Sequence, residues 1–362
     1  MLNSLYTEAI NKKGQLNEPI EELSESKIDL ESKWNEEPIV PSKSKHILAA
    51  GDGSFNKKKY LNFNFYAVAA ESLIYNPLKE KDRLSTIESV ELDIMPHQSF
   101  VDDRLRNMMS IFEIRTAIKT FRDYEVDYYL DDGSILGDLI RPIPLENISQ
   151  DKKQLIIDAA YEKIKSKYEN IDNEFSSFNF KEEFKELFDD EEIDEYDLIR
   201  YLESLENLIA LKYLLENRMK IIAISKTSSS NELFYANIPD MAILDALTRK
   251  EGFSKPYYRK VSNKIKHDFP IENEFFRNLG FTTVFARLKD NKNIIKIEFP
   301  YYIKDDEEKI KEILSVLKEN STEGYPYLLK KAHNDVVISN RDMANLSNVI
   351  GFIDKSGREM LD

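Results

Sequence analysis

The order of the elements predicted between residues 46 and 134 constrains the fold more than any other feature of this sequence. Short apolar or alternating runs at residues 46–50, 60–70 and 86–94 predict three strands. Residues 101–124 contain no Gly or Pro and place apolar side chains at helical spacing, which predicts a helix. Residues 126–130 predict a fourth strand. Three strands, a helix and a further strand indicate a mixed α/β sheet.

Two of these strands are followed by the same motif. Gly-Asp-Gly-Ser at residues 51–54 follows the first strand, and Asp-Asp-Gly-Ser at residues 131–134 follows the fourth. A glycine directly after a carboxylate permits a sharp turn, so we expect each strand to end at an accessible Asp. Taken alone, either copy of Asp-Gly-Ser is ordinary turn chemistry.

The helix between the two motifs carries a third carboxylate, Glu113. Alone, it is explained equally well as a residue at the rim of the core that pairs with Arg106 or Arg115. In the ribonuclease H-like fold, however, the first strand carries an Asp, the helix a Glu and the fourth strand another Asp. This chain has Asp52, Glu113 and Asp132 in that order, so we expect this fold and a site built from the three carboxylates.

The composition restricts what such a site can hold. The chain has no Cys and four His, so oxygen atoms must supply most ligands to any metal, which favours Mn²⁺ or Mg²⁺ over zinc. Carboxylates held close together need cations between them to stay ionised. Two divalent ions could then activate a water molecule and stabilise the leaving oxygen of a phosphodiester.

The rest of the chain suggests additions to this core. Residues 1–45 are predicted to form an N-terminal extension with one or two helices, and residues 46–362 the main domain. Within that domain, residues 150–220 contain two or three strongly charged helices, which we expect to be a largely solvated helical insertion. Residues 220–226, 282–288 and 294–299 are predicted strands, and residues 305–317 and 342–350 are predicted helices.

The net charge of −15 argues against nucleic acid only if charge is evenly distributed, and it is not. Residues 252–267 contain five Lys or Arg and no acid, with two Tyr among them. Phosphate neutralisation combined with base stacking is how single strands are bound without sequence preference. The predicted DNA contacts in this stretch are Lys255, Tyr257, Tyr258, Arg259 and Lys260. A merely solvated basic loop is an equally good interpretation of the residues alone.

From residue 46 to the C-terminus, the sequence resembles the NurA nuclease family of archaea and some bacteria. The resemblance is carried by ordered blocks at residues 50–54, 104–113, 130–136, 224–226, 239–240, 252–254, 298–300 and 324–326, with Arg287 and His333 at matching positions. It implies a ribonuclease H/Piwi-like core that degrades DNA with Mn²⁺ or Mg²⁺. It also implies a homodimer that works beside the hexameric DNA-translocating ATPase HerA in DNA end resection and double-strand break repair.

The resemblance also assigns roles to residues. It implies that Asp52, Glu113 and Asp132 bind metal, that His333 is a further metal ligand or a residue on the phosphate side, and that Tyr325 is an auxiliary catalytic residue. It adds Lys226, beside a loop of three serines, and Arg287 as DNA contacts. Asp131 competes with Asp132, but Asp132 has the same Asp-Gly-Ser frame as Asp52, and alternation would place Asp131 on the opposite face.

The expected function is therefore two-metal hydrolysis of DNA. The resemblance implies a single-strand endonuclease and a 5'-to-3' exonuclease on single- and double-stranded DNA. The alternatives are a non-catalytic DNA-binding adaptor of a DNA-translocating ATPase and, less well supported, a ribonuclease H-like enzyme that acts on RNA. The N-terminus lacks the apolar core of a signal peptide and no stretch could span a bilayer, so we expect a cytoplasmic protein without membrane contact.

Overall fold

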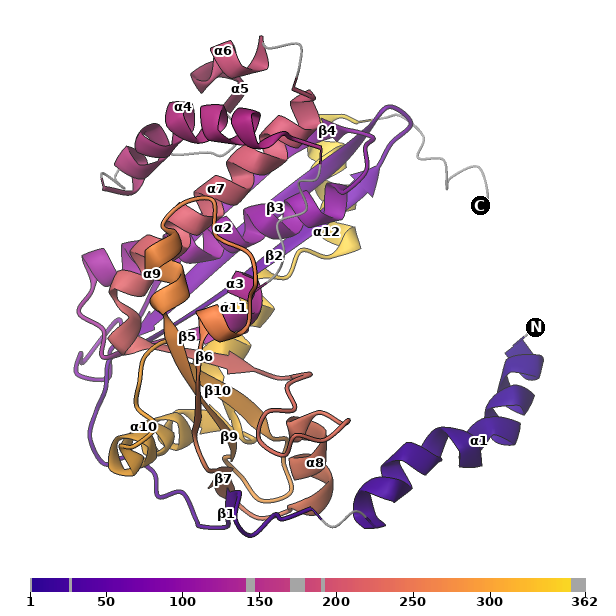
Figure 1. The fold of residues 1–362 in the computed structure, drawn as a ribbon, viewed down its shortest axis with the longest axis vertical. Helices are drawn as coiled ribbons and strands as arrows, with labels where there is room; N and C mark the ends of the chain where they lie inside the picture. The colour runs from indigo at the N-terminus through magenta and orange to yellow at the C-terminus, as the bar shows by residue number, and fades with distance from the viewer. Residues whose placement is uncertain (1, 26–27, 141–146, 170–179, 190–192, 353–362) are drawn as a thin grey trace.

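A long mixed sheet forms the centre of the computed structural model, which describes residues 2–25, 28–140, 147–169, 180–189 and 193–352 (Figure 1). The main sheet has ten strands, in the order β1-β7-β9-β10-β6-β5-β2-β3-β4 with β8 beside β9. These strands are β1 (Trp34–Asn35), β2 (Leu48–Lys59), β3 (Phe63–Tyr75), β4 (Leu84–Pro96), β5 (Tyr128–Asp132), β6 (Ile221–Ser225), β7 (Gly252–Ser254), β8 (Tyr257–Lys260), β9 (Gly280–Arg287) and β10 (Ile295–Phe299). A small second sheet pairs β11 (Ser321–Thr322) with β12 (Tyr325–Pro326).

The predicted opening topology is confirmed. Strands β2, β3 and β4 are antiparallel neighbours, helix α2 (Val101–Asp123) follows them, and β5 then pairs parallel with β2. Strand β6 continues the parallel run on the other side of β5. Because parallel strands present their carboxyl ends at the same edge of a sheet, the ends of β5 and β6 meet beside the middle of β2.

Helices cover both faces of the sheet. One face packs against α10 (Glu307–Glu319), α11 (Tyr327–Val336) and α12 (Asn340–Ile350), and their apolar residues join those of the central strands in two buried clusters. On the other face, α2 packs against β2, β3 and β4, α7 (Glu195–Glu216) packs on α2, and α4 (Gln150–Glu169) packs on α7. Helix α9 (Asn273–Asn278) joins the same apolar cluster as α4 and α7. Short helices α3 (Ile135–Ile140), α5 (Phe180–Glu183), α6 (Lys185–Phe188) and α8 (Asp240–Leu247) complete the chain, with 3₁₀ turns at Arg218–Lys220 and Val261–Asn263. We call these the α11 face and the α2 face.

The expectation of a largely solvated insertion at residues 150–220 is wrong. Most of the apolar residues of α7 are buried, because the helix packs directly on α2. Their interface encloses an ion pair in which Arg104 Nη2 lies 2.7 Å from Glu203 Oε1, with both side chains less than a tenth exposed. The charged residues that suggested a solvated helix include acids that are buried with partners, so charge density was a poor guide to exposure here.

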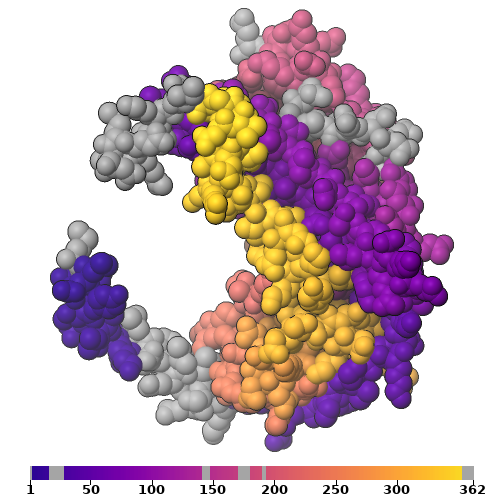
Figure 2. Space-filling model, turned by 180° about the vertical axis from the view of Figure 1, so that it is seen from behind, coloured from indigo at the N-terminus to yellow at the C-terminus, as the bar shows by residue number. Residues whose placement is uncertain are grey.

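Helix α1 (Leu2–Glu25) lies in the predicted N-terminal extension, and its residues 2–15 stand apart from the body of the molecule (Figure 2). Its apolar residues Leu2, Leu5, Tyr6 and Ile10 are all more than half exposed. Trp34 and Asn35, which follow the helix, were not predicted to be a strand but pair with β7 at the edge of the sheet. Within the described ranges, none of the helices combines the length and apolar character that a membrane crossing needs.

Candidate metal centre

Asp52 lies in the middle of β2, not at a turn, which corrects the expected strand end at this residue. The strand continues to Lys59, and Asp52 pairs with Glu71 of β3. The two glycines beside it instead make room on the α2 face. A Cβ on Gly51 would lie 2.0 Å from the hydroxyl oxygen of Tyr129, and a Cβ on Gly53 would lie 2.6 Å from Oε1 of Glu113.

Asp52 meets two other predicted site residues on the α11 face. Asp132 ends β5, as predicted, and His333 projects from α11. His333 Nδ1 lies 2.7 Å from Asp52 Oδ2. One ligand atom from each of Asp52, Asp132 and His333 lies within 4.8 Å of the other two, so they could share one metal ion. Strand alternation places Asp131 on the α2 face, and this geometry favours Asp132 as the ligand.

Two further predicted residues contact the same carboxylate. The Tyr325 hydroxyl donates a hydrogen bond of 3.3 Å to Oδ1 of Asp132. The Lys226 ammonium donates one of 2.6 Å to Oδ2 and lies 5.2 Å from the centre of the Tyr325 ring. The Lys226 side chain is about half exposed and Asp132 is nearly buried, so the ammonium covers the solvent side of the cluster.

Glu113 approaches the cluster from the α2 face and is not in the three-residue group. It is held against Gly53, where the missing side chain leaves space for its carboxylate. Burial raises the pKa of Glu113 well above the usual value, and the charges of Asp131 and Asp52 raise it further. The charge of Asp52 therefore acts on Glu113, although the two side chains lie on opposite faces of β2.

The pKa values of Asp52 and Asp131 are also raised. Burial and the charge of Asp132 raise the pKa of Asp52, although the hydrogen bond from His333 partly opposes this shift. Burial, together with Asp138 and Asp132, raises the pKa of Asp131 to about 7. Desolvated acids that repel one another favour a cation among them, because a divalent ion offsets both effects.

The donor set fits such an ion. Two carboxylates and one imidazole are ligands that Mn²⁺ accepts, and the imidazole suits Mn²⁺ better than Mg²⁺. The ligand atoms come from a strand interior, a strand end and a helix, elements that are fixed by the sheet and its packing. The residues therefore fit a manganese ion at the Asp52–Asp132–His333 group.

Arg287 does not contact DNA as predicted, because its side chain lies inside the protein. It is 1% exposed, donates hydrogen bonds to the Thr248 carbonyl and hydroxyl, and pairs with Asp245 at 3.2 Å. It connects β9 to the end of α8. A residue that matches a family position can thus be structural, and the match alone did not distinguish the two roles.

The other predicted DNA contacts in residues 255–260 are only partly available. Tyr257 points inward, with its hydroxyl 3.1 Å from that of Ser230. Arg259 pairs with Glu232 at 3.2 Å, an acid outside the basic stretch. Tyr258 stacks edge-on against Tyr302, while Lys255 and Lys260 remain at the surface. Their DNA contacts remain predictions.

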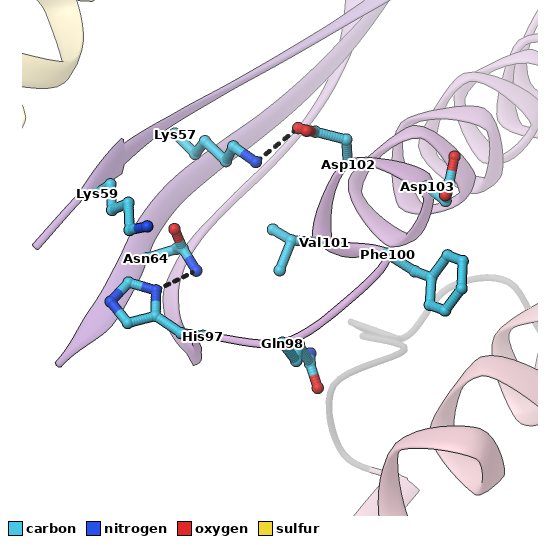
Figure 3. Close-up of a pocket in the computed structure, with 9 residues that line it drawn as sticks. All are labelled: Lys57, Lys59, Asn64, His97, Gln98, Phe100, Val101, Asp102 and Asp103. Atoms are coloured by element: carbon cyan, nitrogen blue, oxygen red, sulfur yellow. Dashed lines mark hydrogen bonds and ion pairs between the residues drawn. The ribbon is translucent and has the colours of Figure 1, made fainter.

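A cavity of about 360 Å³ lies away from the carboxylates, at the far end of β2 (Figure 3). It is lined by residues of β2, β3 and the start of α2, none of them a predicted site residue. Lys57 pairs there with Asp102 at 2.8 Å, on the α2 face. Asp52 faces the opposite side of the same strand, so this cavity is separate from the candidate metal centre.

The strand order and the carboxylate–imidazole cluster define a ribonuclease H-like α/β protein with a candidate metal centre. A family model described as the NurA domain matches residues 46–338. The chain belongs to the NurA family.

Individual relatives agree with this assignment. The chain is 30% identical to a protein named as a probable DNA double-strand break repair nuclease NurA from Methanocaldococcus jannaschii, over 92% of this chain and 85% of the relative. It is 25% identical to the crystallised NurA nuclease from Sulfolobus solfataricus, with a TM-score of 0.73 and 97% of each chain covered. A NurA crystal structure described as bound to dAMP and manganese shares the fold, with a TM-score of 0.67, 17% identity and full coverage of both chains.

Proposed function

We propose that this protein is a manganese-dependent DNA nuclease that acts in the repair of double-strand breaks. The observation that carries the proposal is the convergence of Asp52, Asp132 and His333 on one point of the α11 face. Membership of the NurA family supports it, because relatives across the whole chain are named as nucleases of this kind. The manganese and dAMP in a NurA crystal structure support the metal and the substrate class.

In the proposed site, Asp52, Asp132 and His333 hold the metal, and Glu113 adds a carboxylate from the α2 face. When bound, the ion supplies Lewis acidity toward the phosphodiester and lowers the pKa of a coordinated water molecule. The proposal includes a second ion, as in two-metal hydrolysis, which Glu113 and Asp52 would help to hold.

Lys226 and Tyr325 act on the substrate side of Asp132. The Lys226 ammonium donates a hydrogen bond to Oδ2 of Asp132. Its half-exposed side chain could also donate a hydrogen bond to a non-bridging phosphate oxygen of a bound substrate. Tyr325 restrains Asp132 through the other oxygen and keeps its carboxylate oriented.

The proposal also includes the form of the activity, which is single-strand endonuclease cleavage and 5'-to-3' exonuclease cleavage of single- and double-stranded DNA. It further includes a homodimer and a HerA-type hexameric ATPase as partner. The exposed apolar residues of α1 support an association with another protein surface, since apolar side chains in such a position are stabilised by contact.

The test is cleavage of end-labelled single- and double-stranded DNA with Mn²⁺, Mg²⁺ or EDTA. We expect Mn²⁺-dependent cleavage that EDTA abolishes, and loss of cleavage in Asp52→Asn and Asp132→Asn. Asp158→Asn is the matched control, because Asp158 is an exposed acid on α4. Wild-type rates in Asp52→Asn would refute the assignment, and DNA binding without metal-dependent turnover would instead support a non-catalytic adaptor.

A further inference from the structure

The turn that carries Asp132 is fixed to the neighbouring strand by its backbone. Gly133 has a φ of +157°, which L side chains rarely adopt. Its amide donates a 3.1 Å hydrogen bond to the carbonyl of Ile224, and its carbonyl accepts a 2.6 Å bond from the Ser225 hydroxyl. These bonds hold one side of the turn against β6.

Ser134 fixes the other side of the turn to β10. Its hydroxyl donates a 2.8 Å hydrogen bond to Oε2 of Glu298 and accepts a 3.0 Å bond from the Gly137 amide at the start of α3. Lys296 Nζ also lies 3.4 Å from the hydroxyl oxygen of Ser134. Ser134 therefore connects three elements at the position two residues after Asp132.

Glu298 and Lys296 form a buried ion pair on the α2 face of β10. Glu298 is fully buried, Lys296 is 8% exposed, and their charged groups contact each other. The alternate residues Ile295, Ile297 and Phe299 face the α10 side and pack in its apolar cluster. Two charges are thus placed in the centre of a sheet whose other face is apolar.

A buried ion pair is a weak source of stability, because desolvation of both charges cancels most of their attraction. Apolar residues of similar size would stabilise β10 as well. What they would not provide is an acceptor for the Ser134 hydroxyl. The acceptor, Glu298, lies beside the turn that follows Asp132, a proposed metal ligand, and this position suggests a role in the site.

We infer that Glu298, with Lys296, is a positioning residue that fixes the orientation of Asp132 through Ser134. This inference rests on the proposed function, since Asp132 is there a metal ligand. Partners that orient ligands in this way typically change metal affinity or activity by about 10- to 100-fold when they are removed.

The experiment measures Mn²⁺ binding to the full chain by electron paramagnetic resonance without DNA, and cleavage of single-stranded DNA as a function of Mn²⁺ concentration. Ser134→Ala removes the hydroxyl, Ser134→Thr retains it, and Glu298→Gln retains an acceptor oxygen but removes the charge. Ser347→Ala is the matched control, because Ser347 is fully buried and its hydroxyl donates a hydrogen bond to the Met343 carbonyl of its own helix α12. Thermal unfolding is followed for every variant.

We expect Ser134→Ala to weaken Mn²⁺ binding by about 10-fold or more. Ser134→Thr should restore most of the affinity, and Ser347→Ala should bind Mn²⁺ like wild type. Glu298→Gln should lie between wild type and Ser134→Ala, which keeps a second test available if one variant is unstable.

Wild-type Mn²⁺ affinity in both Ser134→Ala and Glu298→Gln would overturn the inference. The inference would also be overturned if Ser134→Ala and Ser347→Ala lost the same Mn²⁺ affinity for the same loss of thermal stability. If the wild-type protein binds Mn²⁺ without cleaving DNA, the proposed function fails. The Mn²⁺ affinity of Ser134→Ala relative to wild type still decides whether Glu298 and Ser134 position Asp132.

Discussion

Replacement of Gly53 by alanine tests whether Glu113 belongs to the catalytic site. The added Cβ would lie 2.6 Å from Oε1 of Glu113, 2.8 Å from its Cγ and 2.8 Å from Cγ of Met109. Ordinary carbon contacts are about 3.5–4.0 Å, so these side chains must move by roughly 1 Å. Overpacking of this kind costs about 1–3 kcal/mol of folding free energy.

The effect on activity should exceed the effect on folding. A displacement of about 1 Å in a group that positions reacting atoms can lower the rate by about 100-fold. We therefore expect Gly53→Ala to remain folded at 25 °C and to lose about two orders of magnitude in Mn²⁺-dependent DNA cleavage, because Glu113 is pushed away from Asp52.

The assay compares initial cleavage rates at saturating Mn²⁺ with urea unfolding of the same preparations. Gly14→Ala in α1 is the control, since a Cβ there has no neighbour within 4 Å. Adding Gly53→Ala to Glu113→Ala should cost little further activity if both act through the same carboxylate. A folded Gly53→Ala protein that cleaves DNA at the wild-type rate would refute a catalytic position for Glu113.

Three further predictions concern buried charge. Because burial and Asp132 raise the pKa of Asp52, the cleavage rate at limiting Mn²⁺ should fall with decreasing pH earlier than an ordinary Asp would cause. Higher Mn²⁺ should move that fall to lower pH, and pH–rate profiles at two concentrations measure the shift. Burial raises the pKa of Glu206 to about 8, so the native state retains a proton that the unfolded chain releases, and stability should fall as pH rises from 6 to 8 by at most about 3 kcal/mol. Urea unfolding of Glu206→Gln should show a flatter profile than wild type; equal profiles would contradict the burial argument. Arg104→Met leaves Glu203 buried without its partner and should lower the free energy of unfolding by about 3–5 kcal/mol, whereas the double change to Met at both positions should recover part of that loss in the same assay.

The sequence predicted the arrangement of the core because local patterns and topology agree in this region. The helix at residues 101–124 and the strands predicted at residues 60–70 and 86–94 appear within about five residues of their predicted bounds, whereas β2 continues to Lys59, past its predicted end at residue 50. That order implies that β5 lies beside β2, which is what brings Asp132 near Asp52. His333 was placed by resemblance, since no local pattern indicates that α11 lies beside Asp52 in the middle of β2.

Other features depend on contacts between distant segments, which local patterns do not record. The two glycines at positions 51 and 53 were interpreted as turn residues, although their role is to accommodate Tyr129 and Glu113. The burial of Arg287 follows from its packing against α8, and a single basic residue in an apolar strand could have been taken as a sign of it. Glu298 and Lys296 alternate with apolar residues in the same way, a pattern that indicates one polar face on β10.

The acidic doublet at positions 131 and 132 has a consequence for how the site tolerates change. Adjacent residues of β5 face opposite sides of the sheet, so a slip of one residue in its register moves each side chain to the opposite face. In most strands such a slip would remove a ligand. Here the insertion of one residue before β5 would place Asp131 in the position of Asp132 beside His333, and Leu130 in the position of Asp131. The doublet therefore retains a carboxylate beside His333 after an insertion, whereas a deletion would place Gly133 there.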